Sequence, residues 1–263
     1  MNGSLHDYTT VTEAPGAKAS AEQLERLYTR YAFAARYCEG KEVLEVACGS
    51  GQGLGLLAKV SKRVVGGDID EHNLVHARRQ YAGRRGIELK VLDAQDLPFE
   101  DNAFDVIICF EAIYYLAQPV LFFKEAKRVL KSGGLLVLCS VNIEWEDFNP
   151  SPYSYKYYPV SGIARLLREA GFEDKSEFFA SSPVPGDDAP DAVISAIKRA
   201  AVRLKVMPKT MKGKEFLKRV FFGRLSAMPA EIGDEAFKAP APVRVMPVSP
   251  QNGYKIIYAI ARK

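Results

Sequence analysis

Short apolar runs alternate with amphipathic stretches over most of the chain. Runs such as 43–47 and 104–110 have the length of buried strands, whereas residues 70–82 carry apolar positions at helical spacing. Apolar strands separated by helices are typical of a parallel sheet covered on both faces. The pattern predicts helices at 20–37, 53–60, 70–82, 119–131 and 161–170, and strands at 43–47, 63–68, 87–92, 104–110, 135–140, 172–180 and 254–261.

Local signals place several of these boundaries. Ser20 followed by Gln23 is a capping box that begins the first helix. Ser132-Gly133-Gly134 is expected to end the fourth helix, and Gly171 the fifth, because glycine is favoured just past a helix. Between them lies a loop rich in Pro, Tyr and Asn at 141–158.

Composition favours one large domain. The chain has 263 residues, of which 48% are hydrophobic, enough to bury a single core. Its four cysteines form no CxxC pair, and three of them lie in apolar runs, which is typical of free thiols in a reducing compartment. No apolar run reaches membrane-spanning length, and residues 1–10 do not form a secretory signal. We therefore expect a cytoplasmic protein.

Positive charge is concentrated in one segment. Residues 192–224 contain ten cations and one acid, a net +9, so the rest of the chain is −5 against the overall +4. Two amphipathic helices are expected there, with cations opposite apolar residues such as Leu217 and Phe221. The segment is interpreted as a solvated helical face, or as a patch for a phosphorylated acceptor or an anionic membrane surface; nucleic acid is disfavoured.

The loop after the first predicted strand is rich in glycine and follows an acid. It reads Glu45-Val-Ala-Cys-Gly49-Ser-Gly51-Gln-Gly53. A dinucleotide fingerprint needs G-x-G-x-x-G, and leucine stands at the third position in either alignment, so the NAD spacing fails. The Glu45 carboxylate would repel a pyrophosphate but suits the ammonium of a methionine-like group.

Further acids end the next two strands. One carboxylate, here Asp68, can accept hydrogen bonds from both hydroxyls of a ribose, and Ile69 offers an apolar surface to one adenine face. Asp93 would accept from the adenine amino group while the Ala94 amide donates to a ring nitrogen. Either acid alone could equally be a helix cap or a turn residue. Their joint position after the glycine loop favours an adenosine-containing cofactor.

Five segments in this order resemble the class I S-adenosylmethionine-dependent methyltransferases, in the branch that includes the ubiquinone and menaquinone biosynthesis enzymes. They are VLEVACGSGQG, VVGGDID, LDAQDLPF, FDVIICFEAIYYL and RVLKSGGLLVL, and the likeness covers about residues 41–180. It implies a Rossmann-like α/β fold with a seven-stranded, mostly parallel sheet, in which strand 254–261 lies antiparallel between the strands at 135 and 172. It also implies S-adenosylmethionine as the cofactor.

The resemblance assigns Glu45, Gly49 and Gly51 to the methionine end of the cofactor, Asp68 to the ribose, and Asp93 with Ala94 to the adenine. The family usually has glycine where this chain has Ala47. Tyr8, Tyr28 or Arg30 from the N-terminal segment is expected to close over the cofactor. The complete expected set of cofactor contacts is Tyr28, Glu45, Ala47, Gly49, Gly51, Asp68, Ile69, Asp93, Ala94 and Phe110, and no metal site is expected.

Candidate catalytic residues follow the fourth strand. Glu111 and Tyr115 are the candidate bases for a hydroxyl acceptor, with Tyr114 beside them. The related quinone O-methyltransferases have a C-x-E-x-x-E-H run here, and this chain keeps Cys109 and Glu111 but has Tyr114-Tyr115 for the Glu-His pair. That weakens a catechol-quinone interpretation. Tyr114 could instead pack in the core, and Glu111 could support the cofactor loop.

The loop after the fifth strand is the expected acceptor site. Aromatic faces beside carboxylates and amides suit a polyhydroxylated ligand, so Tyr114, Trp145, Tyr153 and Tyr157 are expected to contact the substrate. The phrase EWEDFNPSPYS resembles methyltransferases of bacterial polysaccharide clusters. A Pro/Tyr surface turn without a ligand is the alternative.

The sequence therefore predicts O-methylation of a saccharide or glycan-precursor hydroxyl in polysaccharide biosynthesis. The alternatives are methylation of a quinone, polyketide or other aromatic compound, and a non-catalytic S-adenosylmethionine-binding partner protein. Residues 192–224 are expected to contact an anionic membrane peripherally. The expected single domain consists of an N-terminal cap at 1–40, a cofactor-binding core at 41–182, a basic helical insertion at 183–250 and a last strand at 251–263.

Overall fold

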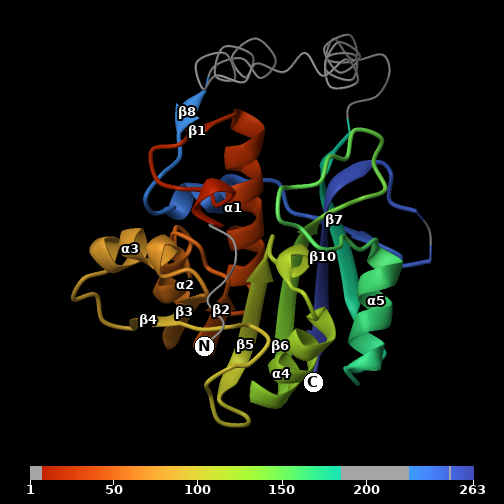
Figure 1. Cartoon of the computed structure of the whole chain (residues 1–263), viewed down its shortest axis with the longest axis horizontal. Helices are drawn as coiled ribbons and strands as arrows, with labels where there is room; N and C mark the ends of the chain where they lie inside the picture. Colours follow the sequence, from red (N-terminus) through yellow and green to blue (C-terminus); the bar gives the residue numbers. More distant parts are fainter. Residues whose placement is uncertain (1–7, 185–224, 249) are drawn as a thin grey trace.

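The protein is built around an eight-stranded sheet, seen in a computed structural model that describes residues 8–184, 225–248 and 250–263. The strand order is β4-β3-β2-β5-β6-β10-β7-β9 (Figure 1). The first five strands in this order are parallel, and β10 is antiparallel to both neighbours. The strands are β2 (Glu42–Val46), β3 (Arg63–Asp68), β4 (Ile87–Val91), β5 (Phe104–Phe110), β6 (Leu130–Val141), β7 (Glu177–Pro183), β9 (Val243–Val245) and β10 (Tyr254–Arg262).

The expected fold class is confirmed, as is the antiparallel strand between β6 and β7. The sheet has one strand more than expected. β9 pairs with β7 at the edge of the sheet, within the stretch 183–250 that was expected to be a basic helical insertion. A three-residue strand between Pro242 and Pro247 is too short to show alternation.

Helices cover both faces of the sheet (Figure 1). Neighbouring residues of one strand point to opposite faces, so Ile108 packs with α1, α2 and α3 while Ile107 packs with α4 and α5. The helices are α1 (Ala21–Ala35), α2 (Leu54–Val60), α3 (Glu71–Gln80), α4 (Pro119–Val129) and α5 (Val160–Glu169), with short 3-10 turns η1 (Tyr8–Thr10), η2 (Ile113–Tyr115) and η3 (Asp234–Lys238).

The predicted boundaries need correction at two places. The fourth helix ends at Val129 rather than 131, and β6 starts at Leu130, because Leu130 pairs with Phe104 and the strand then runs through the glycines. The strand expected at 172–180 begins at Glu177. Gly171 (φ +79°) ends the α5 turn, and the residues after it form a turn held to β10, where Glu173 N–H donates to the Arg262 carbonyl.

The N-terminal segment is held by residues that are distant in the sequence. The predicted capping box is confirmed: Ser20 caps α1, and Gln23 accepts in return. Strand β1 (Lys18–Ala19) pairs with β8 (Ser226–Ala227). Residues 228–236 then pack Met228, Ile232 and Ala236 into the core beside α1. The end of the expected insertion therefore belongs to the folded core, and the two helices expected within 192–224 lie outside the described residues.

Gly53→Ala is expected to destabilise the protein by about 1–3 kcal/mol, because overpacking of a filled core forces side chains from their rotamers. A methyl group at Gly53 would overlap the ring of Tyr31, which is only 4% exposed. Thermal unfolding measures the effect. Gly253→Ala is the matched control, because its added methyl group meets nothing within 4 Å. Equal unfolding temperatures for the two variants would contradict the expected clash.

Candidate functional site

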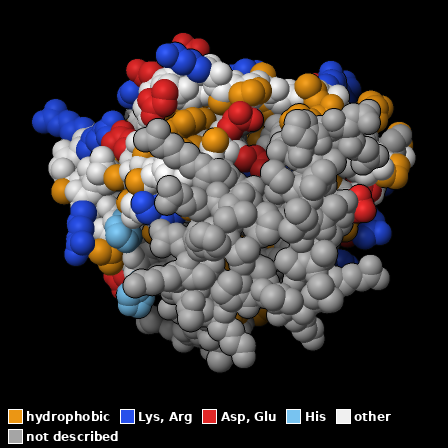
Figure 2. All heavy atoms as spheres, turned by 90° about the horizontal axis from the view of Figure 1, so that it is seen from above, with side chains coloured by type: hydrophobic (Ala, Val, Ile, Leu, Met, Phe, Trp, Pro, Cys, Tyr) orange, Lys and Arg blue, Asp and Glu red, His pale blue; other side chains and the backbone are white. Residues whose placement is uncertain are grey.

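A cavity of about 620 Å³ lies at the carboxyl ends of the parallel strands. The loops after β2, β3, β4 and β5 contribute to its wall, together with α1 and residues 8–13. Ligands of open α/β sheets bind at this edge, because the loops after parallel strands converge there. Figure 2 shows this end of the molecule, where basic and acidic side chains are interspersed with hydrophobic ones over the described surface.

No described helix has the length and apolar character needed to cross a membrane.

The glycine loop turns sharply under the cavity. Ala47, Gly49 and Gly51 all have positive φ, at 52°, 56° and 74°. This left-handed conformation is easy for glycine and costs other residues about 1–2 kcal/mol, which explains why a glycine is usual where this chain has Ala47. Ala47 and Gly49 line the cavity, and Gly51 lies behind it, with its carbonyl accepting a 2.7 Å hydrogen bond from Tyr81.

Glu45 lies at the floor of the cavity and is 1% exposed. Its Oε1 accepts a 2.5 Å hydrogen bond from the Tyr31 hydroxyl, and its Oε2 is buried without a partner among the described residues. Burial raises the pKa of Glu45 to about 7, although the Tyr31 hydrogen bond and the charge of Arg30 oppose this. The site therefore holds one carboxylate oxygen that a ligand cation can satisfy.

Asp68 is held rigidly at the end of β3. Its Oδ2 accepts from the Gly49 amide at 2.8 Å, and its Oδ1 accepts from the Asp70 amide at 2.9 Å and from the Asn73 side chain at 3.3 Å. Burial raises its pKa, although these donors oppose the rise. Asp68 therefore positions the glycine loop and also presents its carboxylate to the cavity.

Residues after the next strands line the cavity beside Asp68. Ile69 is 41% exposed and offers the expected apolar surface. Asp93 and Ala94 also line the cavity, and Asp93 Oδ1 accepts from the Gln95 amide at 2.8 Å, as an ordinary turn residue would. Phe110 lines it at the end of β5, edge-on to Tyr31.

Glu111 follows β5 with a strained backbone. Its φ of 52° is unusual for a residue with a side chain, and such strain is concentrated at functional sites. The carboxylate lines the cavity and accepts from the Tyr114 hydroxyl at 2.9 Å and from the Cys139 thiol at 3.6 Å. Burial raises the pKa of Glu111, opposed by Arg30 and Tyr114. A carboxylate with a raised pKa is a better proton acceptor.

The remaining predicted site residues fall into two groups, those that line the cavity and those that do not. Tyr114 and Tyr115 line the cavity, and burial raises the pKa of Tyr115 to about 12, so its hydroxyl stays protonated near neutral pH and cannot accept the acceptor's proton. Tyr115 also shares a 2.5 Å hydrogen bond with Ser151. The residues that the structure places outside the cavity wall are Tyr28, Gly51, Trp145, Tyr153 and Tyr157.

The aromatic residues outside the cavity wall pack against other side chains. Tyr157 stacks on Tyr114 with ring centroids 4.2 Å apart, so it supports the wall from behind. Tyr153 is edge-on to Tyr8, and Trp145 packs under Lys255. Tyr28 faces the other way on α1 and packs in the core cluster beside η3, where burial raises its pKa.

Residues of the N-terminal segment complete the wall. Tyr8, Thr12 and Glu13 line the cavity, and Tyr8 packs edge-on to Tyr115 at 5.6 Å. Arg30 lines the cavity as expected and is joined by Arg26, which was not predicted; Arg30 forms an ion pair with Glu13. Two arginines four residues apart on the polar side of an amphipathic helix look like a solvated face, and only the fold brings that side over the strand ends.

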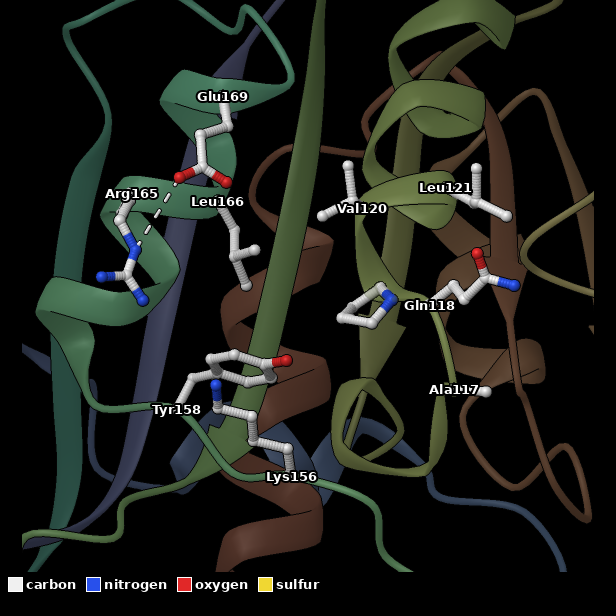
Figure 3. Close-up of a pocket in the computed structure, with 10 residues that line it drawn as sticks. Ala117, Gln118, Val120, Leu121, Lys156, Tyr158, Arg165, Leu166 and Glu169 are labelled. Atoms are coloured by element: carbon white, nitrogen blue, oxygen red, sulfur yellow. Dashed lines mark ion pairs between the residues drawn. The ribbon is translucent and has the colours of Figure 1, made fainter.

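A second cavity of about 570 Å³ lies between α4 and α5 and shares the lining residue Ala117 with the first. Figure 3 shows Gln118, Val120 and Leu121 on one side and Arg165, Leu166 and Glu169 on the other. Lys156 lies over the Tyr158 ring, and Arg165 pairs with Glu169 at 3.8 Å. Both of these side chains are more than half exposed, so the groove is a solvated surface feature.

The known proteins that are similar to this chain include methyltransferases. Residues 44–138 match the model of the methyltransferase domain family. A probable S-adenosylmethionine-dependent methyltransferase of Mycolicibacterium smegmatis is 31% identical over 60% of this chain and 62% of its own length. A ubiquinone biosynthesis O-methyltransferase of Cereibacter sphaeroides is 27% identical over 69% of this chain and 68% of its own.

A solved methyltransferase structure has a similar fold. An S-adenosylmethionine-dependent methyltransferase from Aquifex aeolicus superimposes with a TM-score of 0.50 at 24% identity, covering 61% of this chain and 86% of that one. The chain spans between half and two thirds of the length of the first curated relatives it matches. The matched region contains the glycine loop, Asp68, Asp93 and Glu111. The matched domain and these relatives support a class I S-adenosylmethionine-dependent methyltransferase.

Proposed function

We propose that the protein transfers a methyl group from S-adenosylmethionine to a hydroxyl group of a small hydroxylated acceptor. The observation that carries the proposal is the cavity at the strand ends, which joins Glu45 and Asp68 on one side to Glu111 on the other. Relatives that match the same region carry methyltransferase names.

The residues present fit the proposed cofactor. The unpartnered Glu45 Oε2 suits an ammonium group, because a buried acceptor without a donor costs about 1–3 kcal/mol. Asp68 presents a carboxylate to the cavity for the ribose hydroxyls, and Ile69 with Ala94 provides apolar surface for the adenine. Thr12 closes on the glycine loop: a methyl group at Gly49 would come within 2.9 Å of it.

When bound, the cofactor supplies a methyl group already activated on a sulfonium. The remaining work of the protein is to orient the acceptor, exclude water and remove one proton. Glu111 is the base: it would accept the hydroxyl proton as the acceptor oxygen gains the methyl group and a neutral thioether is left on the cofactor. Tyr114 and Cys139 hold its two oxygens in place. Tyr8 and Tyr115 cover this end and limit the entry of water.

The acceptor class that the site supports best is a saccharide or glycan precursor, as in polysaccharide biosynthesis. Tyr8, Tyr114 and Tyr115 offer flat faces to sugar C–H groups, and Gln23 and Glu111 offer polar partners for hydroxyls. The second candidate is a planar aromatic acceptor, which the same tyrosine faces would stack upon. Contact of residues 192–224 with an anionic membrane stays a prediction, tested by sedimentation with anionic vesicles at low salt.

Calorimetry with S-adenosylhomocysteine tests the proposal first, with NADH as the control. We expect the protein to bind S-adenosylhomocysteine with micromolar affinity and not to bind NADH. A folded protein that binds neither would contradict the proposal. Radiolabelled methyl transfer to panels of saccharides and of hydroxylated aromatics then distinguishes the two acceptor classes.

The affinity for S-adenosylhomocysteine is expected to rise as the pH increases through about 7. Burial raises the pKa of Glu45 to about 7; Tyr31 and Arg30 oppose this, and Asp68 adds to it. The ligand ammonium favours the charged form of Glu45. Below about pH 7, Glu45 must therefore lose its proton when the ligand binds, and the affinity falls by up to about tenfold per pH unit.

Calorimetry in buffers of different ionisation enthalpy measures the released proton. Glu45→Gln is expected to remove both the proton release and the pH dependence. An affinity that is constant between about pH 6 and about pH 8 in the unaltered protein would contradict the assignment of Glu45 to the ammonium.

A further inference from the structure

Three buried hydrogen-bond donors around the acceptor end of the cavity have no partner among the described residues. They are Nε of Arg26, Nε of Arg30 and the indole Nε1 of Trp145. The two arginines line the cavity from α1. Lys255 links Trp145 to Arg26. Its Nζ lies 5.4 Å from the centroid of the indole ring and 2.6 Å from the Glu22 carboxylate, which also pairs with Arg26. A buried donor left unpaired costs about 1–3 kcal/mol, which a ligand oxygen would relieve.

The same cluster carries excess positive charge. Arg26 Nη2 and Lys255 Nζ lie 2.5 Å and 2.6 Å from one oxygen, Glu22 Oε1. Although burial opposes it, these two cations hold the pKa of Glu22 below its usual value, so Glu22 is charged. Arg26, Lys255 and Glu22 together carry a net charge of +1, which Glu111, on which Arg26 also acts, opposes. Lys255 is well covered, with 13% of its side chain exposed, which limits compensation by solvent.

Arg26 lies toward the base and away from Glu45. Tyr31, which holds Glu45, is five residues further along α1, a rise of about 7.5 Å along the helix axis. Arg26 is among the charges that act on Glu111. Ile256, which follows Lys255 in the chain, and its pairing partner Val141 also line the cavity.

We propose that Arg26, supported by Lys255, forms an anion subsite, and that the acceptor carries a carboxylate or phosphate beside the hydroxyl that Glu111 deprotonates. This inference rests on the proposed function and narrows its acceptor to an anionic compound. Guanidinium groups bind such oxygens through charge-assisted hydrogen bonds, which are stronger than neutral ones. A uronic acid or a sugar phosphate has this chemistry.

Trp145 provides the readout, because it is the single tryptophan of the chain and packs on Lys255. The protein saturated with S-adenosylhomocysteine is titrated with inorganic phosphate, acetate, glucuronate, glucose 6-phosphate and glucose, and tryptophan fluorescence is followed. We expect the anions to bind and glucose to bind at least about tenfold more weakly than its charged counterparts. The ratio of glucuronate to glucose 6-phosphate affinity distinguishes a carboxylate from a phosphate subsite.

Two variants test the residues. Arg26→Gln is expected to weaken anion binding about ten- to a hundredfold, because it removes a charge-assisted contact. Glu22→Gln is expected to strengthen it severalfold, because it removes the carboxylate that compensates the cations. Arg78→Gln, on the exposed side of α3 with its partner Glu71, is the matched control and should leave anion binding unchanged. Failure of every anion to bind, or equal binding by Arg26→Gln, would overturn the proposal.

The alternative occupant of Arg26 is the carboxylate of the cofactor itself. S-adenosylhomocysteine and 5′-methylthioadenosine share the adenosine, but the second lacks the amino acid. We expect Arg26→Gln to change the affinity for both by less than about threefold. Selective loss of S-adenosylhomocysteine binding would assign Arg26 to the cofactor and reject the subsite. Absence of S-adenosylhomocysteine binding by the unaltered protein would instead reject the proposed function.

Discussion

Asp68→Ala is expected to weaken S-adenosylhomocysteine binding by more than about a hundredfold. The carboxylate is the expected acceptor for both ribose hydroxyls. It also accepts from the Gly49 amide at 2.8 Å and the Asp70 amide at 2.9 Å, so its removal loosens the glycine loop. Each hydrogen bond to a charged group contributes about 1.5–3 kcal/mol, and the variant loses several at once.

Calorimetry measures this effect, with Asp70→Ala as the control. Asp70 caps α3 through the His72 amide but does not line the cavity. Its removal is expected to cost about 1 kcal/mol of stability and to leave the affinity nearly unchanged. Equal affinities for Asp68→Ala and Asp70→Ala would show that Asp68 does not contact the ligand.

Glu111→Gln is expected to lower the rate of methyl transfer by about two to four orders of magnitude. The amide keeps the volume of the side chain and can still accept from Tyr114, but it cannot take a proton. The rate of label transfer to an acceptor found in the saccharide and aromatic panels measures the loss. A variant that retains more than about a tenth of the activity would exclude Glu111 as the base.

The affinity for S-adenosylhomocysteine separates this role from a supporting one. Glu111→Gln should bind it as the unaltered protein does, because the proposed base acts on the acceptor. A large loss of affinity would instead favour a role in supporting the cofactor loop. Tyr115→Phe is the companion variant: it removes a hydroxyl whose pKa burial raises to about 12, and only a small change in rate is expected.

The positions of the strands along the chain and the cofactor loop could be predicted from the sequence, because both depend on local patterns. The place of β10 between β6 and β7 was expected only from the family resemblance. Buried parallel strands leave continuous apolar runs, and β3 and β5 have the predicted bounds. The glycine loop and the acids at the strand ends are read directly from spacing. Glu45, Asp68, Asp93 and Glu111 do line one cavity.

The acceptor end could not be predicted in the same way, because it is assembled from distant segments. Arg26 has an ordinary position on the polar side of α1, and the fold alone brings it near Glu111 and Lys255. Trp145 and Tyr157 were predicted to contact the substrate because they are aromatic, but residue type does not show which face of a loop points inward. Tyr155, two residues from both Tyr153 and Tyr157, does line the cavity.

The position of β10 constrains the order in which the protein can fold. β10 lies between β6 and β7, and its first residue contacts Asn142 across 112 residues of sequence. During synthesis, β6 must therefore wait with an unpaired edge until residues 254–262 have left the ribosome. Such long-range pairing is slow, and an exposed apolar edge promotes aggregation meanwhile. Expression yield should therefore depend on chaperone capacity more strongly than the stability of the finished fold would suggest.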